Sequence, residues 1–287
     1  MRISLWAGIF MLFIKFGAYF LTGSAALISD ASETIVHLFA VFFANFSLRY
    51  SMKPADSDHP YGHARISFFS AGFEGAMISL AGCFSIFISI WKWVQGVPLT
   101  ALGDGILLTV FSVLINLLLG RVLILKGRAT SSIILEANGK HLLADCWTSI
   151  GVILALVLIS LTKFTWWDPV CGILIGVNIL VSGGLLIRTS VRALMDAADP
   201  SIKECIKKHL DVETVSRNAT YHALRFRDAG SAYWMEVHLQ FDDDMPLVEA
   251  HRLATEIELA LKSILDRPLQ VTTHLEPKEA HDTIHRK

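Results

Sequence analysis

Two pairs of ionisable residues have the types and the spacing of a metal site. Glu33 and His37 are four residues apart, and so are His141 and Asp145. In a helix this spacing places the two members of each pair on one face. Two imidazole nitrogens and two carboxylate oxygens can close a tetrahedral site for zinc or a similar ion. The same groups could instead satisfy one another at a helix contact, but ionisable residues inside a membrane are costly and usually functional.

Other polar positions offer further candidate ligands. Asp30 lies one turn before Glu33, and it could support the ligands, end a helix or line an access path. A short segment holds Asp56, His59 and His63, which could bind a metal or belong to an ordinary solvated loop. Seven of the eleven histidines lie in the last third of the chain: His209, His222, His238, His251, His274, His281 and His285. Their spacing alone does not separate a metal site from surface histidines.

The composition divides the chain into an apolar part and a polar part. Of the 287 residues 53% are hydrophobic and 18% are charged, and 17 of the 26 acidic residues follow Met195. Soluble domains are about a quarter charged, so we predict a membrane domain over residues 1–195 and a cytoplasmic domain over residues 196–287. The net charge of −1 gives no basic excess for a nucleic-acid partner. The four cysteines form no Cys-x-x-Cys pair, which argues against a disulfide framework or a thiolate zinc cluster.

Six stretches have the length and apolarity of membrane-spanning helices. They cover approximately Ile3–Leu21, which Lys15 interrupts, Ala25–Leu48, Ile66–Trp91, Gly105–Leu125, Lys140–Leu161 and Pro169–Ile187. Lysine and arginine concentrate at the N-terminus, in the loops after spans two and four, and after span six, whereas the opposite loops carry only Lys92 and Lys163. By the positive-inside rule we predict a multi-pass protein of the cytoplasmic membrane with both termini in the cytoplasm.

The polar part has the pattern of a small α+β domain. Ile202–Leu210 and Pro246–Leu265 are predicted helices, and Ala223–Arg227, Tyr233–Phe241 and Leu269–His274 are predicted strands. Apolar and polar residues alternate along the second strand, which places His238 on its polar face. The αββαβ order predicts a sheet with its helices on one face.

Several of these segments are similar to motifs of one family. Residues 22–37 read TGSAALISDASETIVH, residues 49–63 read RYSMKPADSDHPYGH and residues 136–145 read EANGKHLLAD. Together with Trp167-Asp168-Pro169 and Leu194-Met195-Asp196, they resemble the second span, the next loop, the fifth span and the two ends of the sixth span in the cation diffusion facilitator family. Within that family the resemblance is to the bacterial iron/zinc efflux type, and it covers nearly the whole chain.

The resemblance implies a homodimer of subunits with six spans and a ferredoxin-like, metallochaperone-like cytoplasmic domain. It implies a cation/proton antiporter that works by alternating access in the lipid bilayer, without a catalytic cofactor. A divalent metal, most simply Zn²⁺, would be both the substrate and a structural or regulatory ligand. The implied ligands are Glu33, His37, His141 and Asp145 for transport, Asp56, His59 and His63 in the loop, and His222, His238, His251, His274 and Glu276 in the cytoplasmic domain. A charge pair between Arg65 and Asp196 would help to hold the dimer.

Two residues depart from the family pattern. The second span usually carries Asp-x-x-x-Asp or His-x-x-x-Asp, whereas this chain has Glu33-x-x-x-His37, and Glu276 stands where related efflux proteins have aspartate. Both remain metal-ligating types, so the ion stays open among Zn²⁺, Fe²⁺, Cd²⁺, Co²⁺, Ni²⁺ and Mn²⁺. The competing classes are a non-transporting metal-sensing paralogue and a membrane-bound metal hydrolase. The complete ligand set argues against the first, and the lack of a visible motif for a substrate pocket and general base argues against the second.

Overall fold

The chain divides into two compact units. The computed structural model describes residues 2–96, 98–129, 133–265 and 267–279, apart from the side chains of residues 2–7, 41, 127, 133–138 and 141. One unit comprises Met1–Phe46 and Ala71–Arg188, and the other comprises Ser47–Ser70 and Thr189–Lys287. The second unit therefore includes the connection between the second and third helices. The predicted domain boundary after residue 195 stays a prediction.

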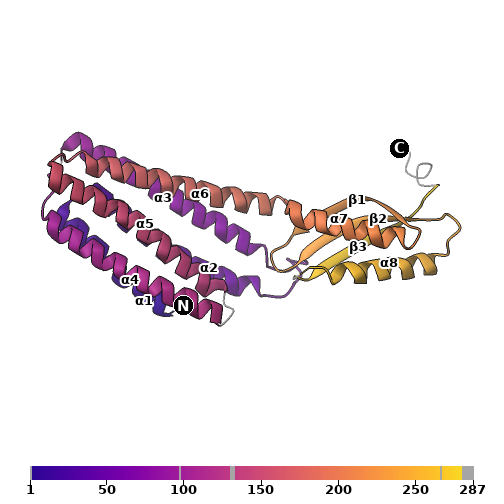
Figure 1. Ribbon diagram of the computed structural model, residues 1–287. Helices are drawn as coiled ribbons and strands as arrows, with labels where there is room; N and C mark the ends of the chain where they lie inside the picture. The colour runs from indigo at the N-terminus through magenta and orange to yellow at the C-terminus, as the bar shows by residue number, and fades with distance from the viewer. Residues whose placement is uncertain (1, 97, 130–132, 266, 280–287) are drawn as a thin grey trace. The chain divides into compact units, whose positions relative to one another are not determined.

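Six helices in the order that the sequence predicts form a bundle (Figure 1), and most of their length belongs to the first unit. Their bounds are α1 (Arg2–Thr22), α2 (Ala25–Ser51), α3 (Ile66–Gln95), α4 (Leu102–Ala129), α5 (Ile133–Thr162) and α6 (Trp167–Leu194). Among the described residues, α2 to α6 contain segments long and apolar enough to cross a membrane, and the apolar part of α1 is the shorter Gly8–Thr22. Large apolar side chains such as Phe42, Phe87 and Leu118 are exposed, as lipid-facing side chains are. The predicted six-helix membrane fold is confirmed, with five of its helices meeting the length and composition of a span.

Helix α2 is fixed at its first turn by two neighbouring helices. The buried Asp168 carboxylate of α6 accepts hydrogen bonds from the hydroxyl of Ser24 and from the backbone N–H groups of Ala25 (2.6 Å) and Ala26 (3.2 Å). Nζ of Lys92, in α3, donates to the carbonyl oxygen of Gly23 (2.6 Å). Free N–H groups and a positive dipole end make a helix N-terminus a good partner for a carboxylate. This cap holds the helix that carries Glu33 and His37 in a defined position.

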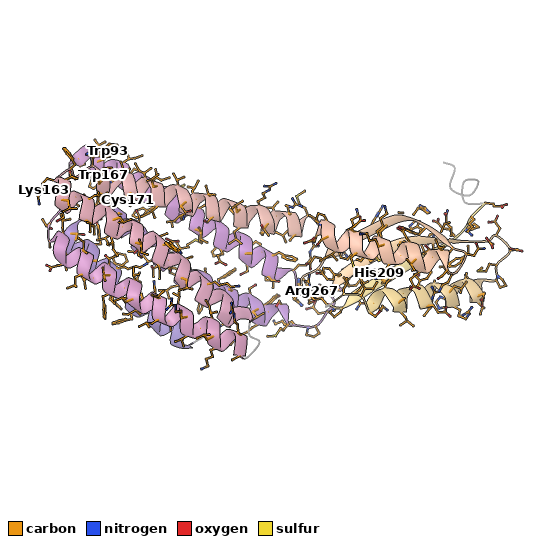
Figure 2. All side chains as sticks on the ribbon, in the orientation of Figure 1. Trp93, Lys163, Trp167, Cys171, His209 and Arg267 are labelled. Atoms are coloured by element: carbon orange, nitrogen blue, oxygen red, sulfur yellow. The ribbon has the colours of Figure 1, made fainter. Side chains whose placement is uncertain are left out.

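The region around this cap is rich in aromatic and polar groups. Figure 2 shows Trp93, Lys163 and Trp167 at the end of the bundle where α5 connects to α6. A cavity of about 230 Å³ opens there, and its lining includes Trp93, Lys163 and Asp168. In the middle of the bundle, α3 and α6 pack backbone to backbone, because a methyl group on Gly82 would lie 2.9 Å from the carbonyl oxygen of Gly176. Only a residue without a side chain permits that approach.

The second unit contains the predicted α+β domain, and its element order is confirmed. The elements are α7 (Pro200–Val215), β1 (Thr220–Asp228), β2 (Tyr233–Phe241), α8 (Leu247–Lys262) and β3 (Leu269–Pro277). The sheet has the order β1-β2-β3, with β1 antiparallel and β3 parallel to the central β2. Helices α7 and α8 lie along the sheet (Figure 1). Asp199 caps α7 by accepting a hydrogen bond from Ser201 N (2.8 Å).

The two faces of β2 are those that the alternation predicts. The apolar face is fully buried under the two helices and consists of Tyr233, Met235, Val237, Leu239 and Phe241. Helix α7 contributes Ile206 and Leu210 to this core, and α8 contributes Ile257 and Leu261. Burial of that many large side chains is what stabilises a small domain. The opposite face is left for polar groups, and it carries the histidines.

Candidate metal sites

Helices α2 and α5 carry the four residues predicted to bind a transported ion, Glu33, His37, His141 and Asp145, called the transport set below. Glu33 and His37 lie on successive turns of α2, and Asp145 is buried in α5 with 7% of its surface exposed. The carboxylates of Glu33 and Asp145 interact electrostatically, so the acidic members of the two helices lie near one another. Oε2 of Glu33 is buried and has no hydrogen-bond partner within the part of the chain that the structure describes. The side chain of His141 lies outside the described residues, so the complete set stays a prediction.

Two residues beside the transport set, Lys15 and Ser149, were not predicted as part of a site. Nζ of Lys15 donates to Oδ1 of Asp30 (2.9 Å), and the hydroxyl of Ser149 donates to the same carboxylate (3.2 Å to each oxygen). In the sequence Lys15 stands only as an interruption of an apolar stretch. A basic residue in one span and an acidic residue in the next are the signal for such a pair, because neither charge is stable alone in a membrane.

Two groups of described residues bring three ligand atoms within 4.8 Å of one another, and both belong to the second unit. The first is the loop cluster, Asp56, His59 and His63, between α2 and α3. Oδ1 of Asp56 lies 3.1 Å from Nδ1 of His59, and Oδ2 lies 3.4 Å from Nε2 of His63. The structure therefore assembles all three residues that the sequence predicts for this loop.

The loop itself shapes this cluster. Oδ1 of Asp56 accepts hydrogen bonds from the backbone N–H groups of His59 (2.7 Å) and Asp58 (3.1 Å), which close a tight turn. The backbone hydrogen bond from His59 is the largest cause that lowers the pKa of the Asp56 carboxyl, and the His59 side chain adds to it. The anionic form is thereby favoured, as metal binding requires.

The tautomer of His63 is set by its surroundings. Its Nδ1 lies 3.1 Å from the carbonyl oxygen of Pro54, which can only accept, so Nδ1 carries the proton. In the neutral ring Nε2 then presents a lone pair toward the carboxylate of Asp56. A second hydrogen bond of this kind is the usual support of a metal-binding histidine. The side chain of His63 is 3% exposed and those of Asp56 and His59 about half exposed, so the cluster has one buried and two accessible members.

The second group is the cytoplasmic cluster, His222, His238 and Glu276, on the polar face of the sheet. Strand register produces it. His222 pairs with His238 across β1 and β2, and His238 pairs with His274 across β2 and β3. Glu276 follows His274 by two residues and so shares its face. Three predicted ligands, His222, His238 and His274, are thus paired side by side across the three strands, and the fourth, Glu276, lies two residues further along β3.

Glu276 is the centre of this cluster. Its carboxylate is 2% exposed and lies 2.6 Å from Nε2 of His222, 2.7 Å from Nδ1 of His238 and 3.6 Å from Nε2 of His274. Burial by itself would raise the pKa of the carboxyl, but the hydrogen bonds from His222 and His238 outweigh it and lower that pKa. The result is a carboxylate with imidazole nitrogens on both oxygens, which is a donor set suited to zinc.

Two predicted cytoplasmic ligands are not among the three members of this cluster: His274 lies beside it on β3, and His251 lies on another element. His251 is exposed on α8, and its carbonyl oxygen accepts a hydrogen bond from Thr255. The exposed His209 lies on α7 (Figure 2), where Nδ1 contacts the carbonyl oxygen of Cys205 at 2.9 Å. His281 and His285 lie outside the described residues. A role for His251 as a ligand stays a prediction.

Comparison with known protein families shows which family this chain belongs to. The model of the cation efflux transmembrane domain matches residues 1–195, and the model of the cytoplasmic domain of cation efflux proteins matches residues 200–278. The chain belongs to the cation efflux family. This family consists of transporters, so the hydrolase alternative is excluded, and the chain is a multi-pass membrane transporter of cations. The matched cytoplasmic domain is the dimerisation domain of cation efflux proteins.

Two relatives, a transporter and a cation-efflux pump, agree with this membership. The uncharacterized transporter sll1263 of Synechocystis sp. is 33% identical over 282 residues, which cover 96% of this chain and 89% of the relative. The cation-efflux pump FieF of Escherichia coli is 28% identical over 254 residues, 88% of this chain and 83% of the pump. A solved chain of CzrB is 37% identical, with 28% of this chain and 98% of that chain covered and a TM-score of 0.27. The Zn form of CzrB is 36% identical, with 31% and 94% covered and a TM-score of 0.27.

Proposed function

We propose that the chain exports Zn²⁺ from the cytoplasm in exchange for protons, through a site formed by the transport set. Membership of the cation efflux family supports export of a cation. The observation that carries the site is the Oε2 atom of Glu33, which is buried and has no hydrogen-bond partner among the described residues. A buried carboxylate oxygen without a donor is costly, and a bound cation would satisfy it.

The choice of zinc follows from the types of ligand. Glu33 and Asp145 supply two oxygen donors, and His37 and His141 supply two imidazole nitrogens. Magnesium and manganese sites favour oxygen ligands, and copper(I) sites favour sulfur. Two nitrogens and two oxygens in a site of four suit zinc, with Fe²⁺, Cd²⁺, Co²⁺ and Ni²⁺ as competitors.

Proton coupling follows from the same ligands. An imidazole binds a metal only when it is neutral, so protons and metal compete at His37 and His141. Protons that enter from the outer side would displace the metal there, and neutral imidazoles would reload it from the cytoplasm. A site that opens alternately to the two sides of the membrane would thereby exchange zinc for protons.

The cytoplasmic cluster and the loop cluster belong to this proposal as regulatory sites of a homodimer. The cytoplasmic cluster lies within the domain that the family uses for dimerisation. Metal bound there would report the cytoplasmic concentration of the substrate, and metal that bridges two copies would stabilise the dimer by mass action.

Flux measurements in proteoliposomes test the transport site. With a proton gradient that runs inward, opposite to the direction of zinc export, the parent chain is expected to move Zn²⁺. Asp145→Ala and His141→Ala are expected to abolish the flux. His209→Ala is the matched control, because that histidine is exposed on α7. Flux that survives both site variants would contradict the ligand assignment. No flux of any divalent ion in the parent chain would favour the non-transporting paralogue.

Competition between ions tests the choice of substrate. Zn²⁺ flux is expected to exceed Mn²⁺ flux at equal concentrations, because Mn²⁺ prefers oxygen donors. A strong preference for Mn²⁺ or for Fe²⁺ would overturn zinc and leave the transport site in place.

A further inference from the structure

Lys15 is a basic residue in the middle of an apolar helix, and the proposed mechanism has not used it. Its side chain is only 3% exposed, and Nζ donates to Oδ1 of Asp30 and to Oγ1 of Thr34, each at 2.9 Å. Asp30 is 1% exposed. Burial of a charged side chain in a membrane helix costs free energy, and such residues usually have a function.

The hydrogen bonds of this pair reach both helices of the transport set. Asp30 lies one turn before Glu33 on α2 and accepts a hydrogen bond from Ser149 of α5. Ser149 in turn follows Asp145 by four residues, so the two lie on one face of α5. The network therefore connects α1, α2 and α5 at points one helical turn from the ligands. A shift of either helix along its axis would break these bonds.

The acidic and basic groups around this pair are also unequal in number. Lys15 interacts electrostatically with the carboxylates of Asp30, Asp145 and Glu33. Three carboxylates therefore surround one ammonium, and with all three ionised, as metal binding requires of the ligands, the region would carry two negative charges in excess. A divalent cation held by Glu33 and Asp145 would cancel that excess, because metal-bound imidazoles are neutral.

We propose that Lys15, held by Asp30, is the fixed counter-charge of the transport site, and that the bond between Asp30 and Ser149 sets the register of α2 against α5. This inference rests on the proposed transport set. Lys15 and Asp30 are positioning residues that act through the electric field at the site. Removing Asp30 alone would leave an unpaired positive charge that repels the ion. Removing Lys15 alone would leave an unpaired negative charge that attracts it and slows its release.

A set of charge variants separates this role from a simple tie between helices. The variants are Lys15→Met, Asp30→Asn and the double variant Lys15→Met with Asp30→Asn, measured as KM and maximal rate of Zn²⁺ flux in proteoliposomes. Asp30→Asn is expected to raise KM by about tenfold or more, since one unit charge near a partly buried site is worth at least that factor. Lys15→Met is expected to leave KM unchanged or lower and to reduce the maximal rate. The double variant restores charge balance, and its KM is expected to return to within about threefold of the parent.

A purely structural tie would give a different pattern, with equal losses in the two single variants and no rescue in the double variant. That pattern, or a KM in Lys15→Met that rises as far as in Asp30→Asn, would overturn the counter-charge role. Lys15→Arg keeps the charge and is expected to keep the KM of the parent, which checks the assignment if Lys15→Met does not fold. Ser149→Ala keeps every charge, so it is expected to lower the maximal rate through lost register and to leave the effect of Asp30→Asn on KM intact. Failure of the parent chain to transport any divalent ion would instead reject the proposed function.

Discussion

Arg65 and Asp196 form an ion pair that joins the start of α3 to the end of α6 within the second unit. Nη2 of Arg65 donates to Oδ1 of Asp196 at 2.6 Å and to the carbonyl oxygen of Leu194 at 2.8 Å. Oδ2 of the same aspartate lies 3.6 Å from Nη1 of Arg227 in β1. Asp196 adopts a φ of 60°, a left-handed conformation that aspartate and asparagine tolerate better than most residues. One carboxylate thus connects the ends of two membrane helices to the sheet.

Asp196→Ala is predicted to weaken the dimer or to uncouple the membrane helices from the cytoplasmic domain. Because the side chains of Arg65 and Asp196 are about 40% exposed, we expect the pair to contribute about 1 kcal/mol or less to stability. Asp196→Asn is the matched control, since it loses the charge and keeps the tolerance of the left-handed backbone. The fraction of dimer by light scattering and the rate of Zn²⁺ flux measure the effect. An unchanged dimer together with unchanged flux would reject this role.

Zinc is predicted to stabilise the cytoplasmic domain through the histidines of the sheet. Binding to the folded state alone adds about 2.7 kcal/mol when the free ligand is at 100 times its Kd. His238→Ala combined with His274→Ala should remove most of the zinc-induced rise in the thermal midpoint of the full chain. His209→Ala should keep it, because that residue lies on α7 away from the polar face. Equal shifts in the double variant and the parent would count against the site.

Strand faces and span positions could be predicted because each follows from a local pattern. Alternation along β2 places Met235 and His238 on opposite faces, and the structure confirms it. In β1 the same rule fails, because strict alternation would put His222 and Phe226 on one face. A register shift between His222 and Arg225, with Ala223 at a φ of 51°, moves Phe226 into the core and leaves His222 beside Glu276. Such a bulge depends on the partner strand and has no clear signal in the sequence.

The interior of the bundle shows the other limit of sequence reasoning. Lys15, Asp30 and Ser149 lie on three helices and meet only because of how those helices are rotated. Apolar spans carry a weak amphipathic pattern, so the inward face of each helix cannot be predicted from periodicity with the certainty that a surface helix allows. The residue types in the sequence indicated a metal site. The contacts among Lys15, Asp30 and Ser149 follow only from how the helices pack.

The metal-free protein is predicted to lose stability in acid partly through Glu276. The folded state lowers the pKa of this carboxyl, so its hydrogen bonds stabilise the fold fully above the unfolded pKa of about 4.3. That contribution is lost as the pH falls through the lower, folded pKa. With a chelator present, the thermal midpoint of Glu276→Gln should therefore fall less between about pH 6 and pH 3 than that of the parent. Glu204→Gln, an exposed residue of α7, should behave as the parent does, and a Glu276→Gln profile parallel to the parent would refute the linkage.

Both termini are predicted to lie in the cytoplasm, with the α5–α6 connection on the opposite side. Phe164 lies in that connection and is 61% exposed, and Val248 at the start of α8 is 83% exposed. In a chain whose four cysteines are replaced, an impermeant thiol reagent should label Phe164→Cys in intact cells. It should label Val248→Cys only after the membrane is opened. Labelling of both from one side would overturn the orientation that the positive residues predict.

Glu33 offers a way to distinguish a ligand from a structural residue. A structural carboxylate is satisfied in the folded protein, and its replacement by an amide destabilises the fold. Oε2 of Glu33 is buried and has no hydrogen-bond partner among the described residues, so Glu33→Gln removes a charge whose burial is unfavourable. The metal-free thermal midpoint of Glu33→Gln should therefore stay level or rise, while Zn²⁺ flux should fall by at least about tenfold, as functional sites often trade stability for activity. Glu33→Asp keeps the charge on a side chain shorter by one methylene, and it should retain part of the flux. A Glu33→Gln chain that melts earlier and still transports zinc would show that Glu33 holds the bundle together and does not bind the ion.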